Sequence, residues 1–154
     1  MNALVAFYSR TGTTKKVAVE IAGLLKADVD EIIDKKNRKG AVGYMLAGRD
    51  ATLKKLTKIE AKKDASKYDL VVVGTPVWAF TVSAPVRTYL TKNKGRLKRV
   101  AFFCTEDGSG SQRAFKAMSE ICGKTSKAHL VLRTKEVWKG NIKEKIKEFV
   151  EKLG

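Results

Sequence analysis

The chain has 154 residues, of which 44% are hydrophobic, and we expect it to form a single domain, residues 1–154, with its own core. No apolar run is long enough to cross a membrane and no leader pattern precedes the first apolar segment, so we expect a cytoplasmic protein without a membrane span. Two cysteines, Cys104 and Cys122, and one histidine, His129, are too few for a metal cluster, and we expect no metal.

The formal net charge is +16, which is strongly basic. The charge is densest between residues 35 and 63, where ten basic residues stand against Asp50 and Glu60. Such a field favours anionic partners and raises the rate of encounter with them. No helix-turn-helix, zinc-finger or RNA-recognition pattern accompanies it, and the lysines are spread over the whole chain. We therefore do not expect nucleic acid as a partner.

In chain order, apolar runs alternate with amphipathic patterns. The first run, residues 3–7, predicts a strand, and the apolar spacing over 13–26 predicts a helix after it. The continuous apolar run at 70–73 is typical of a strand that is buried on both faces. Further predicted strands cover residues 29–33, 100–104 and 129–133; further predicted helices cover 84–91, 112–122 and an apolar stripe from 142 to 153; and residues 37–63 predict a loop followed by an irregular helix.

Five strands that alternate with helices predict an α/β fold in which helices cover both faces of a parallel sheet. Ligands of such sheets bind beyond the carboxyl ends of the strands, where the strand order reverses. The segments that follow the first, third and fourth strands should therefore meet at one edge of the sheet.

The first of these segments, residues 9–14, reads Ser-Arg-Thr-Gly-Thr-Thr. It lies between a strand and the start of a helix, where free backbone N–H groups and the helix dipole favour an anion. Ser9, Thr11, Thr13 and Thr14 can donate further hydrogen bonds to a phosphate. A helix N-cap in a polar turn is the alternative, but four hydroxyls in six residues favour a phosphate site.

Other phosphate-binding motifs do not fit. The GxxxxGK-[ST] run of nucleotide-binding loops is absent, and the third glycine of the dinucleotide fingerprint is missing after Gly110. No Cys-x5-Arg run follows the first strand. Phe7, Tyr8 and Ser9 stand where a phosphoacceptor receiver domain would have paired acids.

The second segment, residues 74–80, carries Trp78 and Phe80. Both follow the predicted end of their strand, so they need not be buried in the core. Either ring can stack on a flat heteroaromatic ligand, with packing in the core or on the surface as the alternative. Pro76 limits the entropy that this segment loses on binding.

The third segment, residues 105–110, contains Glu106, Asp107 and the flexible Gly108. Backbone N–H and C=O groups in such a turn can bind the polar edge of a ring. A helix N-cap at Ser109 or Ser111 is the alternative interpretation.

At these residues the sequence resembles the flavodoxin family of FMN-binding proteins, over nearly the whole chain. The resemblance is carried by Ser-x-Thr-Gly-x-Thr at 9–14, Gly-Thr-Pro-Val-Trp at 74–78 and the glycine-bearing segment at 105–110. The run GAVGYMLAGRDA at 40–51 is also similar to a segment of flavodoxin-like proteins from bacteria and archaea. The uninterrupted fifth strand resembles the short-chain type.

The resemblance implies a flavodoxin-like three-layer α/β/α sandwich with a five-stranded parallel sheet in the order 2-1-3-4-5. It implies one noncovalent FMN, with its phosphate on residues 9–14 and its ring between the second and third segments. It implies electron transfer between redox partner proteins and no catalytic residue. The cofactor-binding residues implied are Ser9, Arg10, Thr11, Gly12, Thr13, Thr14, Thr75, Pro76, Val77, Trp78, Ala79, Phe80, Thr105, Glu106, Asp107, Gly108 and Ser109.

The sequence departs from the family pattern in two ways. Many flavodoxins are acidic, whereas this chain is basic, so we expect partners with acidic docking surfaces and a raised flavin potential. No tyrosine in the third segment is placed to stack on the outer face of the ring. Trp78 is then the sole stacking ring, or a partner subunit covers the other face.

Two other functions stay open. An FMN-dependent NAD(P)H:quinone-type oxidoreductase on the same fold would bind a second substrate over the ring, with residues 40–51 as a candidate dimer interface. A flavin-free module would instead bind nucleic acid through the basic surface. The sequence allows a monomer or a homodimer.

Overall fold

The computed structural model describes residues 1–154, and its main sheet is six-stranded with the order β2-β1-β5-β7-β8. Short β6 pairs antiparallel with the end of β5, and β3 and β4 form a separate two-stranded sheet. The five strands on the main path run parallel, so the predicted order 2-1-3-4-5 is confirmed. The strands are β1 (Ala3–Phe7), β2 (Asp28–Glu31), β3 (Ile33–Asp34), β4 (Ile59–Glu60), β5 (Leu70–Trp78), β6 (Thr81–Val82), β7 (Arg99–Glu106) and β8 (Ser126–Arg133).

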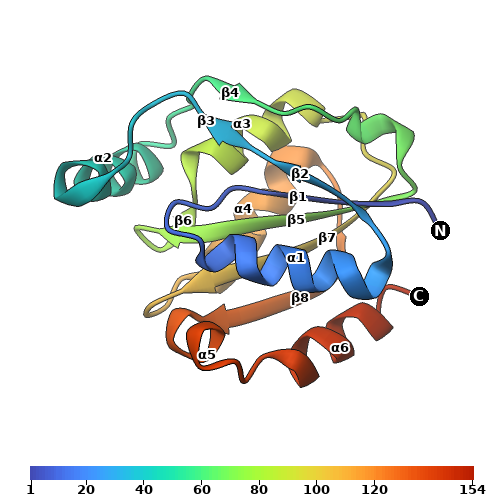
Figure 1. Cartoon of the computed structure of the whole chain (residues 1–154). Helices are drawn as coiled ribbons and strands as arrows, with labels where there is room; N and C mark the ends of the chain where they lie inside the picture. The colour runs from blue at the N-terminus through green and yellow to red at the C-terminus, as the bar shows by residue number, and fades with distance from the viewer.

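Helices cover both faces of this sheet, which gives the three layers predicted (Figure 1). One face carries α1 (Thr13–Leu25), α5 (Thr134–Lys139) and α6 (Lys143–Glu151). The other face carries α2 (Gly40–Thr52), α3 (Ala84–Asn93) and α4 (Ser111–Cys122), and a short 3₁₀ turn at Ala65–Lys67 precedes β5.

The central strand β5 shows why the sequence forms two cores. Leu70 and Val72 belong to the cluster under α1 and α6, whereas Val71 and Val73 belong to the cluster under α3 and α4. Successive side chains of a strand point to opposite faces, so an unbroken apolar run is stable only with helices on both sides. Burial of each such side chain contributes about 1.5–3 kcal/mol.

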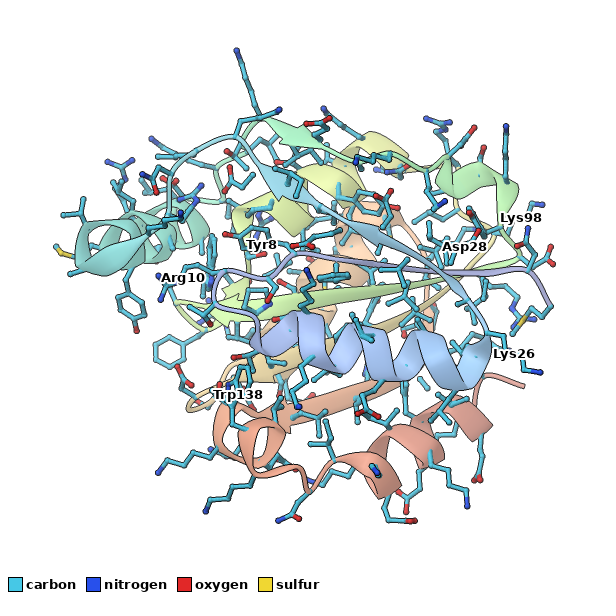
Figure 2. All side chains as sticks on the ribbon, viewed as in Figure 1. Tyr8, Arg10, Lys26, Asp28, Lys98 and Trp138 are labelled. Carbon is cyan, nitrogen blue, oxygen red and sulfur yellow. The ribbon has the colours of Figure 1, made fainter.

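The strand register determines where a site can form. Phe7 pairs with Gly74 across β1 and β5, and Pro76 pairs with Thr105 across β5 and β7. The segments after these three strands therefore emerge at one edge of the sheet, at the left of Figure 1. In Figure 2, Tyr8, Arg10 and Trp138 lie at this end, and Lys26, Asp28 and Lys98 lie toward the opposite end.

Several elements differ from the expectation, and the short strand β4 within the predicted loop and helix region is one of them. The third predicted strand, residues 70–73, continues as β5 to Trp78 and turns back into β6. The middle region holds a regular 13-residue helix, α2, instead of an irregular one. This helix packs closely against the preceding segment, because Gly43 lies against the backbone of Arg38, where a Cβ would overlap the Arg38 carbonyl group. The short helix α5 was not predicted.

Candidate functional site

A cavity of about 300 Å³ opens at the carboxyl edge of β1, β5 and β7. Its walls come from the segments after these three strands, with α2 and the start of α5 completing them. Twelve of the seventeen cofactor-binding residues implied by the sequence are among its lining residues. The full lining is Ser9, Arg10, Thr11, Thr13, Thr14, Tyr44, Ala47, Gly48, Pro76, Val77, Trp78, Ala79, Thr105, Glu106, Asp107 and Thr134.

The start of α1 forms one wall. Gly12 is the N-cap residue and adopts φ 98°, a conformation that residues with a Cβ rarely take. Its N–H donates to Ser9 Oγ over 3.0 Å, but no side chain caps the helix. The first N–H groups of α1 are therefore free to bind an anion next to the hydroxyls of Thr13 and Thr14.

Two hydrogen bonds hold these hydroxyls in place. Thr14 Oγ1 and Thr105 Oγ1 lie 2.8 Å apart and are both buried, which joins the first segment to the third. Trp138 on α5 donates its Nε1–H to Thr13 Oγ1 over 3.0 Å. The hydroxyl-rich segment is thus fixed from two sides by residues distant in the sequence.

Trp78 forms the apolar wall, in a position that differs from the expectation. It is the last residue of β5 and only 8% exposed, because the strand continues past Thr75 instead of ending before it. Its ring contacts the ring of Tyr8 edge-on, with a centroid distance of 5.4 Å. Burial, with Asp34 nearby, raises the pKa of Tyr8 to about 12, so this tyrosine stays neutral.

Arg38 supports Trp78 from outside the cavity lining. Its guanidinium carbon lies 5.2 Å from the centre of the Trp78 ring, within cation–π range. Arg38 Nε donates to Asp34 Oδ2 and Arg38 Nη1 donates to Asp50 Oδ2, each over 2.7 Å. All three side chains are buried, so they form an ion-pair network beneath the aromatic wall.

The charge of Asp50 depends on this network. Burial opposes ionisation of Asp50, yet hydrogen bonds from Arg38, Lys36 and Arg49 lower its pKa to about 2. Arg38 also connects to the first segment, because Arg10 Nη1 donates to the Arg38 carbonyl oxygen over 3.1 Å. The ion pairs therefore tie the β3–α2 connection to both walls of the cavity.

The third segment contributes a carboxylate without a partner. Glu106 is 7% exposed, and its Oε2 makes no hydrogen bond within the protein. Because Glu106 lines the cavity, a ligand hydroxyl or N–H group can donate to it.

Five of the implied residues lie outside the lining. Gly12 is the N-cap of α1, and buried Thr75 donates its hydroxyl to Ser83 Oγ over 2.9 Å. Phe80 is 57% exposed at the β5–β6 turn and shares a separate shallow depression with Gly108 and Ser109.

The sequence reasoning did not find four lining residues: Tyr44, Ala47 and Gly48 on α2, and Thr134 on α5. The guanidinium carbon of Arg10 lies 5.5 Å from the centre of the Tyr44 ring, which connects α2 to the first segment. The small residues of the 40–51 run were the available signal, because Ala47 and Gly48 leave room at the cavity wall. Nothing in the sequence near Thr134 marks it.

No helix has the length and apolar character needed to span a membrane. No group of three or more His, Cys, Asp and Glu side chains is arranged to hold a metal ion.

A comparison with curated protein sequences found no match. Among solved structures, a flavoprotein from Lactobacillus acidophilus NCFM in complex with FMN is 27% identical, with a TM-score of 0.73 over 90% of this chain and 97% of that one. A candidate flavoprotein from Bacteroides uniformis is 22% identical, with a TM-score of 0.79 over 97% of both chains. Megasphaera elsdenii flavodoxin is 18% identical, with a TM-score of 0.60 over 99% of both chains. The flavodoxin family model matches residues 2–153, and the chain therefore belongs to the flavodoxin family.

Proposed function

We propose that this protein binds FMN in the cavity and carries electrons between redox proteins. The observation that carries the proposal is a single cavity with two different walls. One wall is the uncapped start of α1 with its hydroxyls, and the other is the buried side chain of Trp78. FMN has a phosphate at one end and a flat ring system at the other, joined by a ribityl chain. The family match and the FMN complex of the L. acidophilus flavoprotein support the same cofactor.

The residues present fit the phosphate of FMN. The N–H groups at the start of α1 and the hydroxyls of Ser9, Thr11 and Thr13 supply donors, and Arg10 supplies a positive charge at the same wall. No lysine is needed, because the helix start itself favours a dianion.

The residues at the other wall fit the ring and its polar edge. Trp78 offers a ring for stacking, and Pro76 and Val77 line the same apolar part of the cavity. The partnerless Glu106 Oε2 can accept a hydrogen bond from a ribityl hydroxyl or a ring N–H of FMN.

FMN supplies the redox chemistry when bound, and the chain sets where and how readily it occurs. Arg10 on the cavity wall has no carboxylate partner and would stabilise negative charge that develops in the cavity, whereas the charge of Arg38 is balanced by Asp34 and Asp50. We therefore expect the reduced cofactor to be favoured more than it would be in an acidic flavodoxin.

Titration of the cofactor-free protein with FMN, followed by its visible absorption, tests the first half of the proposal. We expect saturable binding at one site with a shifted flavin spectrum. A protein that leaves the spectrum of FMN unchanged would overturn the proposed cofactor.

The carrier role is tested on the same loaded protein. We expect slow oxidation of NADPH by the protein alone and fast flavin reduction once a flavodoxin reductase is added. Rapid NADPH oxidation with a quinone and no second protein would overturn the carrier role and indicate a quinone reductase.

We further propose that electron partners are acidic and dock over α2. This helix exposes Val42, Tyr44 and Met45 beside the cavity, and Tyr44 also lines it. Exposed Lys39 at the N-cap of α2 adds positive charge next to this apolar surface. Opposite charge at such a rim raises the rate of encounter more than the affinity.

Electron transfer from the reduced protein should therefore depend on partner charge and on salt. With partners of matched potential, we expect faster transfer to an acidic iron–sulfur protein than to a basic cytochrome at low salt. Raising ionic strength to about 0.5 M should slow the first reaction, because the Debye length shrinks to a few ångströms. Stopped-flow absorption measures both rates.

Matched variants locate the docking face. Lys39→Glu should slow transfer to the acidic partner, whereas Lys147→Glu makes the same charge change on α6, which contributes no residue to the cavity lining, and should have a smaller effect. Equal effects of the two variants would mean that the salt dependence comes from the net charge of the protein, and would contradict docking over α2.

A further inference from the structure

Trp138 on α5 has an unusual contact for a surface tryptophan. Its side chain is 57% exposed, yet its Nε1–H donates to Thr13 Oγ1 at the start of α1, 125 residues earlier. Its ring also lies 4.0 Å from the Cβ position of Gly12, and Lys16 Nζ lies 5.7 Å from the ring centre. Figure 2 shows Trp138 at the same end of the molecule as Arg10.

The direction of this hydrogen bond has a chemical consequence. An indole N–H is only a donor, so Thr13 Oγ1 must be the acceptor. The threonine hydroxyl has one proton, and no other hydrogen bond engages Thr13 Oγ1 within the protein. Because Thr13 lines the cavity, that proton is free to be donated to a ligand there.

The neighbouring hydroxyl is not committed in this way. Thr14 Oγ1 and Thr105 Oγ1 lie 2.8 Å apart, and either of them can be the donor. The direction of that bond is not fixed by the two threonines, whereas the indole N–H fixes the direction of the bond at Thr13. Thr13 is therefore the hydroxyl whose role is set by a third residue.

We propose that Trp138 is a positioning residue that commits the Thr13 hydroxyl to donate to the phosphate of the bound cofactor. This inference rests on the proposed function, because it needs FMN in the cavity. Trp138 is not among the residues that line the cavity, and it acts through Thr13. It makes α5, which the phosphate motif of the sequence does not include, part of the phosphate site.

The test compares FMN with riboflavin, which lacks the phosphate, in the full-length protein. Trp138→Phe removes the indole N–H donor and keeps one aromatic ring on α5; it also loses the Cη2 contact near Gly12, which carries no hydrogen bond and should affect FMN and riboflavin alike. One hydrogen bond of ordinary net strength corresponds to about a fivefold change in the dissociation constant. We expect Trp138→Phe to weaken FMN by about fivefold and to leave riboflavin binding unchanged, as measured by titration calorimetry.

A double-mutant cycle shows whether Trp138 acts through Thr13. Thr13→Val removes the hydroxyl with little change in shape. In that background, Trp138→Phe should have no further effect on FMN. Circular dichroism of each cofactor-free variant checks that the fold is kept.

The outcomes separate this inference from the proposed function. Wild-type protein that fails to bind FMN overturns the proposed cofactor. Wild-type protein that binds FMN while Trp138→Phe weakens FMN and riboflavin equally, or neither, overturns the positioning role. Additive losses in the double variant also overturn it, because Trp138 would then act independently of Thr13.

Discussion

Replacing Arg38 with leucine should lower the free energy of unfolding by about 3–5 kcal/mol, the usual cost of removing one partner from a buried ion pair. The side chains of Arg38, Asp34 and Asp50 are only 3–4% exposed, so the two carboxylates would lose their main partner without gaining water. Urea unfolding of the cofactor-free protein measures the change.

Arg49→Leu is the matched control. Arg49 also pairs with Asp50, over 3.2 Å, but its side chain is 51% exposed. Exposed pairs contribute roughly 0–1 kcal/mol, so we expect a loss within that range. A loss below 1 kcal/mol for Arg38→Leu would mean that its burial cost cancels its attraction to the two acids.

The same network predicts how stability depends on pH. The pKa of Asp50 is about 2 in the folded protein, below its ordinary value of 3.8. A lowered folded pKa gives a stabilisation that is complete above about pH 4 and lost as the pH falls through about 2. We expect the free energy of unfolding of the wild type to fall over this window. In Arg38→Leu this dependence should shrink or reverse, which chemical unfolding at several pH values would measure.

Replacing Trp78 with alanine should weaken FMN binding on the order of 100-fold, if the flavin ring stacks on this side chain. Loss of stacking and of buried apolar area together corresponds to about 3 kcal/mol, and each 1.4 kcal/mol is tenfold in the dissociation constant. Trp78→Phe keeps an aromatic wall and should weaken binding by less than tenfold. Titration with FMN, followed by flavin fluorescence, gives both values.

Phe80→Ala is the control for this experiment. Phe80 is two residues further along, exposed at the β5–β6 turn and outside the cavity lining. We expect its loss to change FMN affinity by less than twofold. A large loss for Phe80→Ala with little change for Trp78→Ala would place the ring outside the cavity.

The sheet was predictable because its signals are local. Residues 3–7 form an unbroken apolar run, and the hydroxyl-rich segment lies close behind it. One short part of the sequence therefore predicts the strand, the anion site and the helix. The alternation of such units specifies a parallel sheet, and a parallel sheet brings its connecting segments to one edge. The assignment of individual residues to FMN remains a prediction.

The position of Trp78 was not predictable from local signals. Thr75 and Pro76 look like the end of a strand, since proline cannot donate to a ladder. Pro76 lies in β5 all the same, and the strand continues to pair with β7 up to this residue and with β6 beyond it. Burial of Trp78 follows from the tight turn between β5 and β6, from the pairing of β5 with the distant β7, and from Arg38, which is 40 residues earlier in the chain.

The parts of the site from α2 and α5 were missed for a different reason. In α2, Ala47 and Gly48 matter through the space that they leave, which a sequence does not display. In α5, six residues are too few for a periodic pattern, and Trp138 meets Thr13 only after the whole sheet has formed. Contacts of this kind depend on tertiary packing and leave no local signature.

The contact between Trp138 and Thr13 also means that the cavity forms only after segments far apart in the sequence have folded together. Its walls join the segments after β1, β5 and β7 to α2 and α5, so a form in which any of these elements is unfolded lacks part of the site. A ligand that binds only the folded state adds to stability by mass action, about 2.7 kcal/mol at a free concentration 100 times its dissociation constant. The supply of cofactor in the cell would then govern the lifetime of the protein as well as its redox state, because chains without cofactor unfold more often and are exposed to proteases.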